Sequence, residues 1–419
     1  MPLAGMVYSA VLAQKRGHAL QKIISEPGGV VELMIGTTNY RKEGLARALD
    51  RIGEVRACYS FVPYIAFRCQ ASDAAGLVSH INGRGRFYRE LKAMLSVEAS
   101  GTFSIPKIED AFPKPKKKVK AEDVGSSLWN LVATGAYKAR QYSCGENTNV
   151  AVIDTGANYL HPEIQPCFNG KKGHNFLNNT DFVIDDNGHG THVSGIIAGR
   201  NCGVAPKTKL AALKVLNKDG EGSESAIISA LEWCVKNNMD VANLSLGAPV
   251  ASSAFEEMCS YAASAGLLIV AAAGNDGKRT ITYPAGFGEP VIGVAATDRE
   301  NNHAVFSNIS PTNDISAPGV DILSSYLSDY AVLDGTSMSA PHVAGALSLA
   351  VSYAKKADLE DVLERTAQDL TPEKDDWDVF GAGLLRADLF MSALARSRRV
   401  AKALNERQSL AELVRKVFW

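Results

Sequence analysis

A glycine-containing turn leads into a long apolar run at Ser337. The local sequence is Gly-Thr-Ser-Met-Ser, and the apolar run continues to Ala354. This pattern predicts that the serine hydroxyl lies at the N-terminus of a helix, among backbone N–H groups that lack a helical partner. Taken alone, such a serine is either a helix cap or a nucleophile whose developing oxyanion is stabilised by those N–H groups.

Three other stretches carry side chains of the kinds that acyl transfer needs. Asp154 ends the apolar run Val-Ala-Val-Ile and places a carboxylate at the end of a strand. His189 lies in Asn-Gly-His-Gly-Thr-His, at a glycine-rich helix start, and Asn275 follows Ala-Ala-Ala-Gly just beyond another strand. Together with Ser337 they supply a nucleophile, a base, a group that orients the base and a donor to an oxyanion.

Each motif has a competing interpretation when it stands alone. Asp-Thr-Gly also occurs in aspartic proteases, but those enzymes need a second such tripeptide and the sequence has none. His-Gly-Thr-His lacks the glutamate and the spacing of a zinc-binding His-Glu-x-x-His helix, which argues against a metal there. The serine lies outside a Gly-x-Ser-x-Gly motif and comes last in the chain, which argues against an α/β-hydrolase.

Taken together, the motifs resemble those of the subtilisin-like serine proteases. The resemblance covers residues 128 to about 393 and rests on Gly-Thr-Ser-Met-Ser-Ala-Pro-His-Val-Ala-Gly, His-Gly-Thr-His-Val and the order Asp, His, Ser. It implies that Ser337 is the nucleophile and His189 the general base and acid. It also implies that Asp154 holds the histidine tautomer and that Asn275 donates to the oxyanion. The expected activity is a serine endopeptidase that forms an acyl-enzyme and needs no cofactor for its chemistry.

The resemblance further implies how peptide and protein substrates bind. In this family an extended peptide lies between two edge segments. The matching residues here are Gly220, Glu221 and Gly222 on one side and Ser245, Leu246 and Gly247 on the other. Ala272, Ala273 and Gly274 are expected to line the pocket before the scissile bond. Because none of these three is charged, the sequence predicts a preference for apolar or medium-sized side chains.

Structural calcium is an open question in the sequence. The loop after the His189 helix is short, with only Arg-Asn-Cys before Gly203, so the tight calcium site of some relatives is not expected. Asp314, with carbonyl groups near residues 284–291, is a candidate for a weaker cation site. Glu163 is either a calcium ligand or an ordinary surface acid.

Apolar strands alternate with helical patterns beyond residue 128, which predicts an α/β fold with a mostly parallel sheet and helices on both faces. The predicted strands are 149–154, 209–216, 241–246, 267–273 and 291–296. Ligands bind at the carboxyl ends of the strands in such sheets. Asp154 and Asn275 both fall at that edge.

Residues 29–105 contain a β-α-β-β-α-β pattern, which predicts a small ferredoxin-like α+β domain. Its position and size resemble those of the pro-domains that assist folding of subtilisin-like proteases and then block the cleft. The resemblance therefore implies a self-processing zymogen with its pro-domain as an intramolecular inhibitor. Two alternatives remain: a permanently inhibited protease that acts as a regulated binding protein, and activation by another protease.

The other segments contribute less. Residues 1–28 form an N-terminal extension, and the proline- and lysine-rich stretch 106–127 predicts an extended linker, either solvated or exposed to cleavage. The catalytic domain spans 128–395, and 396–419 form a basic tail that is either a docked helix or a partner-binding segment.

The net charge of −1 suggests no nucleic-acid partner, and no apolar run predicts a membrane span. Seven cysteines without a CxxC pair slightly favour the cytoplasm over secretion.

Overall fold

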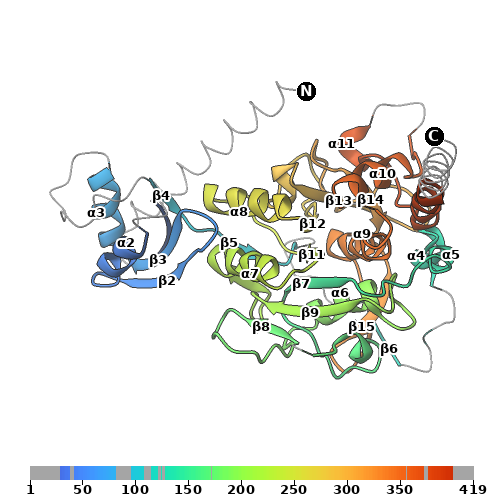
Figure 1. Cartoon of the computed structure of the whole chain (residues 1–419), viewed down its shortest axis with the longest axis horizontal. Coiled ribbons are helices and arrows are strands. Elements are labelled where there is room, and N and C mark those ends of the chain that lie inside the picture. Colours follow the sequence, from blue (N-terminus) through green and yellow to red (C-terminus); the bar gives the residue numbers. More distant parts are fainter. Residues whose placement is uncertain are drawn as a thin grey trace, which may run out of the picture.

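The computed structural model describes residues 29–37, 42–81, 96–107, 115–120, 124, 128–170, 172–354, 356–371 and 376–399. A small N-terminal domain lies beside a larger α/β domain, and the chain crosses between them through strand β5 (Figure 1). The extension 1–28 and the part of the basic tail beyond residue 399 lie outside the described residues.

A seven-stranded sheet forms the centre of the larger domain, in the order β14-β13-β12-β11-β7-β9-β8. All its strand pairs are parallel, as the apolar runs predict. The strands are β7 (Asn149–Asp154), β8 (Gly173–Asn175), β9 (Lys209–Lys214), β11 (Val241–Leu244), β12 (Leu268–Ala272), β13 (Val291–Thr297) and β14 (Ile315–Pro318). The five predicted strands are confirmed, and β8 and β14 extend the sheet at its two edges.

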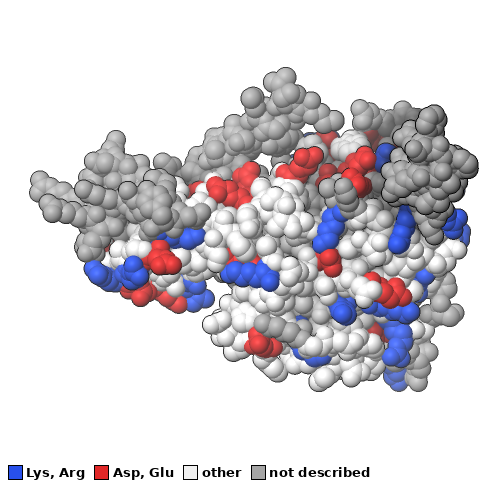
Figure 2. Space-filling view, viewed as in Figure 1, with Lys and Arg blue, Asp and Glu red and all other residues white. Residues whose placement is uncertain are grey.

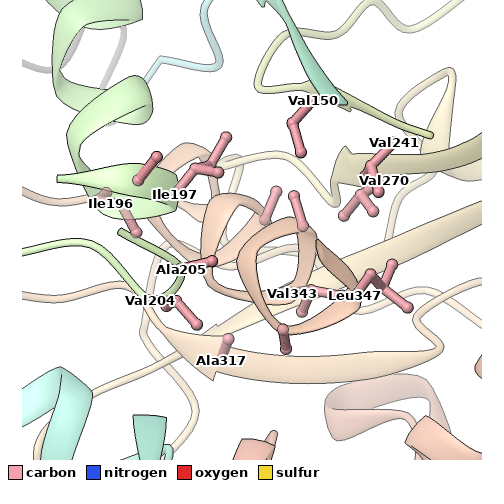
Figure 3. Packing of buried hydrophobic residues seen from close by; sticks show 14 of the residues in the cluster. Val150, Ile196, Ile197, Val204, Ala205, Val241, Val270, Ala317, Val343 and Leu347 are labelled. Atoms are coloured by element: carbon pink, nitrogen blue, oxygen red, sulfur yellow. The ribbon is translucent and has the colours of Figure 1, made fainter. Parts of the chain in front are cut away.

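Helices cover both faces of this sheet. Helices α6 (His189–Ala198) and α9 (Thr336–Ala350) pack on one face, with Val150 and Val152 of β7 in their core. Helices α7 (Glu224–Lys236) and α8 (Ser253–Ser264) share the other core with the alternate β7 residues Ala151 and Ile153. Every residue of α9 is buried, which explains its continuous apolar sequence. Figure 3 shows Val343 and Leu347 of α9 among the strand residues Val150, Val241 and Val270.

The small domain is a four-stranded antiparallel sheet in the order β2-β3-β1-β4, which is the predicted ferredoxin-like arrangement. Its elements are β1 (Val30–Gly36), α2 (Lys42–Leu49), β2 (Glu54–Cys58), β3 (Tyr64–Gln70), α3 (Ala71–Ile81) and β4 (Ser96–Ala99). Leu33 and Phe67 on one face of the sheet pack in the domain's own core. Met34 and Ala66 on the other face join the core that contains α7 and α8, so the two domains share one apolar interface.

Shorter strands connect the domains and the linker. Strand β5 (Thr102–Ser104) pairs antiparallel with β10 (Glu221–Ser223). The hairpin of β15 (Ile322–Tyr326) and β16 (Asp329–Leu333) takes β6 (Lys117–Val119) as a third strand. The stretch 106–127 is therefore not extended solvated chain throughout, because its middle part completes this small sheet. Lys116, next to β6, forms ion pairs with Asp321 and Asp334.

The remaining helices complete the larger domain. They are α4 (Trp129–Ala133), α5 (Ala136–Ala139), α10 (Leu359–Arg365) and α11 (Trp377–Phe380), followed by a helix over residues 387–399. Phe390 and Leu394 bury that last helix in the core, whereas its final residues 396–399, at the start of the basic tail, are exposed. Acidic and basic side chains are interspersed on the face shown in Figure 2. Among the described residues, no helix has the length and apolar character needed to cross a membrane.

Candidate active site

The last residue of β7 and the first residue of α6 meet at the carboxyl edge of the large sheet. Asp154 is 0% and His189 2% exposed. The Nδ1–H of His189 donates to both carboxylate oxygens of Asp154, at 2.8 and 3.0 Å. This bond places the proton on Nδ1 and leaves Nε2 able to accept a proton, which is the tautomer that a general base needs.

The glycines around His189 make this approach possible. A Cβ atom at Gly190 would lie 2.1 Å from the carbonyl oxygen of Gly156, in the loop after Asp154. Gly188 has φ 109°, a left-handed conformation that favours glycine. The Gly-His-Gly sequence therefore lets the start of α6 pack directly against the end of β7.

Ser337 is the second residue of α9 and does not cap the helix. Its hydroxyl donates to the carbonyl oxygen of Ser245, at 3.2 Å, instead of accepting a helical N–H. Pro341 has no N–H, so the Ser337 carbonyl lacks its usual helical donor. The Ser245 hydroxyl donates to that carbonyl instead, at 2.9 Å. Ser245 thus holds both the hydroxyl and the carbonyl group of Ser337.

The hydrogen bond between the serine and the histidine is not formed in this conformation. Within the described part of the chain, His189 Nε2 has no hydrogen-bond partner, and the Ser337 proton points to Ser245. Catalytic hydrogen bonds often tighten only when a substrate is bound. The Asp154–His189 half of the site is therefore assembled, and the serine half has still to turn toward the imidazole.

Asn275, in the loop after β12, has its carboxamide held in one orientation. Its Oδ1 accepts hydrogen bonds from the N–H of Thr336, at 2.9 Å, and from the Thr336 hydroxyl, at 2.8 Å. The Nδ2 group is therefore left to donate, and it donates to the carbonyl oxygen of Pro106 at 2.9 Å. The role of Thr336 was missed by the sequence analysis, although it directly precedes Ser337.

Comparison with known proteins identifies the family. The model of the Subtilase family matches residues 145–383. Subtilisin DY from Bacillus licheniformis is 38% identical over 268 residues, which are 62% of this chain and 95% of that protein. Subtilisin BL from Lederbergia lenta is 42% identical over 253 residues, or 58% of this chain and 90% of that protein. This chain belongs to the subtilase family.

The subtilase is accordingly a serine endopeptidase, as its motifs predict. Its fold also matches a solved structure described as fervidolysin from Fervidobacterium pennivorans, a keratinolytic enzyme related to subtilisin. The TM-score is 0.71 at 24% sequence identity, and the match covers 88% of this chain and 62% of fervidolysin. That comparison supports the subtilisin-like α/β fold.

Both predicted edge segments of the subtilase hydrogen-bond to a piece of the same chain. Ser104 exchanges two backbone hydrogen bonds with Gly247, at 3.1 and 2.8 Å. The N–H of Ile105 donates to the Gly220 carbonyl at 3.0 Å, and Glu221 and Gly222 lie in β10, which pairs with β5. Leu246, by contrast, is fully buried in the core.

A cleft of about 540 Å³ lies beside Pro106 and Lys107. Gly274 lines this cleft, whereas Ala272, at the end of β12, and Ala273, just after it, are 0% and 2% exposed and do not. Asp276 and Lys278, which the sequence analysis did not name, also line the cleft. The preference for apolar or medium-sized side chains stays a prediction.

The carboxylate of Glu163 is surrounded by hydrogen-bond donors and is not an ordinary surface acid. It is 2% exposed and accepts bonds from the N–H groups of Asn201 and Cys202, at 2.5 and 2.9 Å, and from the Tyr330 hydroxyl at 2.8 Å. Burial alone raises its pKa, but these donors together lower it. A cation does not fit here, because N–H and O–H groups face the carboxylate from the positions that ligand oxygens would need.

Asp314 lies in a cluster of carboxylates that the sequence analysis recognised only in part. Ligand atoms of Asp314, Glu360 and Glu364 all lie within 4.8 Å of one another. Burial, together with neighbouring carboxylates, raises the pKa of Asp314 to about 8 and that of Glu360 to about 7. The residues suit a hard cation such as calcium, since all the ligands are oxygen. Glu360 and Glu364 come from α10, one helical turn apart, and only folding brings them to Asp314.

We expect Glu360→Gln to raise the thermal unfolding midpoint at pH 9 by about 2–4 °C, the response to roughly 1 kcal/mol in a domain near this size. When folding raises the pKa of a carboxyl group, the free energy of unfolding is highest at low pH. It falls as the pH rises from the unfolded-state pKa of about 4 through the pKa in the folded state. The gain should therefore be small at pH 5, where Glu360, with a folded pKa of about 7, is neutral. Calorimetry without divalent cations measures it, with the exposed Asp361→Asn as control. A larger gain at pH 5 than at pH 9 would contradict this account.

The other histidines of the two motifs have structural roles. His192 Nε2 lies 3.1 and 3.0 Å from the carbonyl oxygens of Ile322 and Ala331, and His342 Nδ1 lies 2.8 Å from that of Met338. Burial lowers the pKa of His192 to about 3 and that of His342 to about 4. Both are therefore neutral near pH 7 and hold neighbouring backbone in place.

Proposed function

We propose that this serine endopeptidase is made as a zymogen that cuts its own chain once, between Pro106 and Lys107. The observation that carries the proposal is the 2.9 Å hydrogen bond from Asn275 Nδ2 to the Pro106 carbonyl oxygen. An oxyanion donor belongs on the carbonyl that is to be attacked. Residues 102–105, directly upstream of Pro106, pair with both predicted peptide-binding edges. The segment therefore lies as a substrate would lie, with Pro106 as the last residue before the bond that is cut.

The chemistry follows from the positions of the four side chains. Ser337 Oγ attacks the Pro106 carbonyl carbon while His189 Nε2 takes the hydroxyl proton. Asp154 stabilises the imidazolium through Nδ1. The oxyanion that forms receives hydrogen bonds from Asn275 Nδ2 and from the Ser337 backbone N–H.

Collapse of this intermediate breaks the bond to the Lys107 nitrogen, which receives the proton from His189. The Pro106 acyl group is then esterified to Ser337. Water deprotonated by His189 attacks the ester, releases the Pro106 carboxylate and restores the serine. Peptide and protein substrates follow the same steps once the cleft is free.

In this proposal, residues 29–106 act as an inhibitory pro-domain after the cut. Two features support this. The segment 102–106 takes the hydrogen bonds that a substrate would use, and Met34, Tyr64 and Phe103 lie in one core with α7 and α8 of the catalytic domain. Release of the pro-domain, rather than cleavage alone, then limits the appearance of activity toward other proteins.

Intact mass of the purified full-length chain, followed over time beside Ser337→Ala, tests the proposal. We expect the wild type to yield a product whose N-terminal sequence begins Lys-Ile-Glu, the residues from Lys107 onward, while the variant stays whole. A wild type that stays whole but is converted by an added protease would show activation by another enzyme. Cleavage at a different bond would overturn the assignment of Pro106.

A further inference from the structure

A buried carboxylate in the loop before α6 has no part in the chemistry described so far. Asp185 is 4% exposed. Its Oδ1 accepts hydrogen bonds from the Thr155 hydroxyl and from the N–H groups of Asn187 and Gly188, at 2.9, 3.0 and 2.9 Å. Its Oδ2 accepts from the N–H and the hydroxyl of Thr191, at 2.9 and 2.6 Å. All five donors are neutral, and three of them are backbone N–H groups at the start of the helix that carries His189.

The ionised carboxylate fixes the direction of the Thr155 hydroxyl. A carboxylate can only accept, so the single hydroxyl proton of Thr155 must point to Asp185. The hydroxyl oxygen is then free to accept the N–H of Gly190, which it does at 2.9 Å. Thr155 therefore joins Asp185 to the residue that follows the catalytic histidine.

Thr155 also holds the catalytic carboxylate. Its backbone N–H donates to Asp154 Oδ1 at 2.7 Å, the same oxygen that receives the His189 Nδ1–H. Thr155 directly follows Asp154, and Thr191 follows His189 by two residues. The five hydrogen bonds to Asp185 thus tie together the two chain segments that present Asp154 and His189.

We propose that Asp185 is a positioning residue for catalysis, which through Thr155 and the start of α6 fixes the relative placement of Asp154 and His189. An asparagine at this position has one acceptor oxygen and an NH₂ group that would face N–H donors. At least one side of the network must then open, and the end of β7 can move relative to the start of α6. Small displacements of reacting groups cost up to about 10² in rate.

The test compares Asp185→Asn and Thr155→Val with three references: the wild type, Thr155→Ser and Asp181→Asn. Thr155→Ser keeps the hydroxyl. Asp181→Asn removes a carboxylate from the same loop, where the side chain is 67% exposed. All five chains are assayed in the same form with a peptide amide, well below their unfolding midpoints. The readouts are kcat, KM and the midpoint of the acid limb of kcat/KM against pH.

We expect Asp185→Asn and Thr155→Val to lower kcat by about 10- to 100-fold with KM within about threefold, and to move the acid-limb midpoint. Thr155→Ser and Asp181→Asn should stay within about threefold of the wild type in kcat. If Asp185→Asn does not fold, the pair Thr155→Val and Thr155→Ser decides. A lower unfolding midpoint with unchanged kcat and pH profile would reduce Asp185 to a structural residue. The inference rests on the peptidase activity and not on self-processing. Turnover by the wild type in the same assay distinguishes a failure of this inference from an absence of peptidase activity.

Discussion

Replacing Ser337 with alanine is expected to lower kcat for peptide hydrolysis by about 10⁶, the size of the loss in subtilisin, a magnitude taken over from that relative. The neighbouring Ser245 does not replace the lost nucleophile, because its hydroxyl is held on the Ser337 carbonyl. The variant should keep the wild-type fold. In the wild type, the hydroxyl that the variant lacks donates only one hydrogen bond, at 3.2 Å, to the Ser245 carbonyl. The hydrogen bond from the Ser245 hydroxyl to the backbone carbonyl of residue 337 remains in the variant.

Peptide turnover and thermal unfolding of Ser337→Ala measure these two effects separately. Ser339→Ala is the matched control, since it also removes a fully buried hydroxyl from the first turns of α9. We expect the control to keep kcat within about tenfold of the wild type. Residual activity of Ser337→Ala above about one part in 10³ would point to another nucleophile.

Asp154→Asn is expected to lower kcat by about 10⁴ near neutral pH while the fold is retained. The Asp154 carboxylate can only accept, so it fixes the proton on His189 Nδ1. An asparagine can instead present its NH₂ group to the ring, which would stabilise the tautomer with the proton on Nε2. That tautomer cannot take the proton of Ser337.

Steady-state kinetics of Asp154→Asn across pH 6 to 10 measure the loss, with the exposed Asp361→Asn as a control that makes the same chemical change. We expect kcat to carry nearly the whole effect, because Asp154 is fully buried and lies behind His189. A kcat within tenfold of the wild type would mean that another group orients the imidazole.

The sequence alone determined the family and the parallel sheet, and it predicted the residues that do the chemistry. These features are local in the chain. Apolar runs and helical periods predict the strands and helices. Glycines within two residues of Asp154, His189 and Ser337 in the sequence permit the close approaches that each residue needs. The prediction that Ser337 is a nucleophile rather than a helix cap needed only the other motifs.

Other features depend on which residues meet across long stretches of chain, and only the tertiary structure decided them. Asn275 meets Pro106 across 169 residues, and Glu163 meets Tyr330 across 167. From the sequence, Pro106 was predicted to begin a linker, and Glu163 to be a calcium ligand or a surface acid.

The reason is that a polar side chain has the same sequence signature whether it faces water, a cation or a set of buried donors. Its partner is fixed by packing and by the need to satisfy every buried polar group, which no local pattern records. Asp185 illustrates this limit, because two of its donors, the Thr155 and Thr191 hydroxyls, stand on opposite sides of it in the chain and meet only where α6 packs on β7.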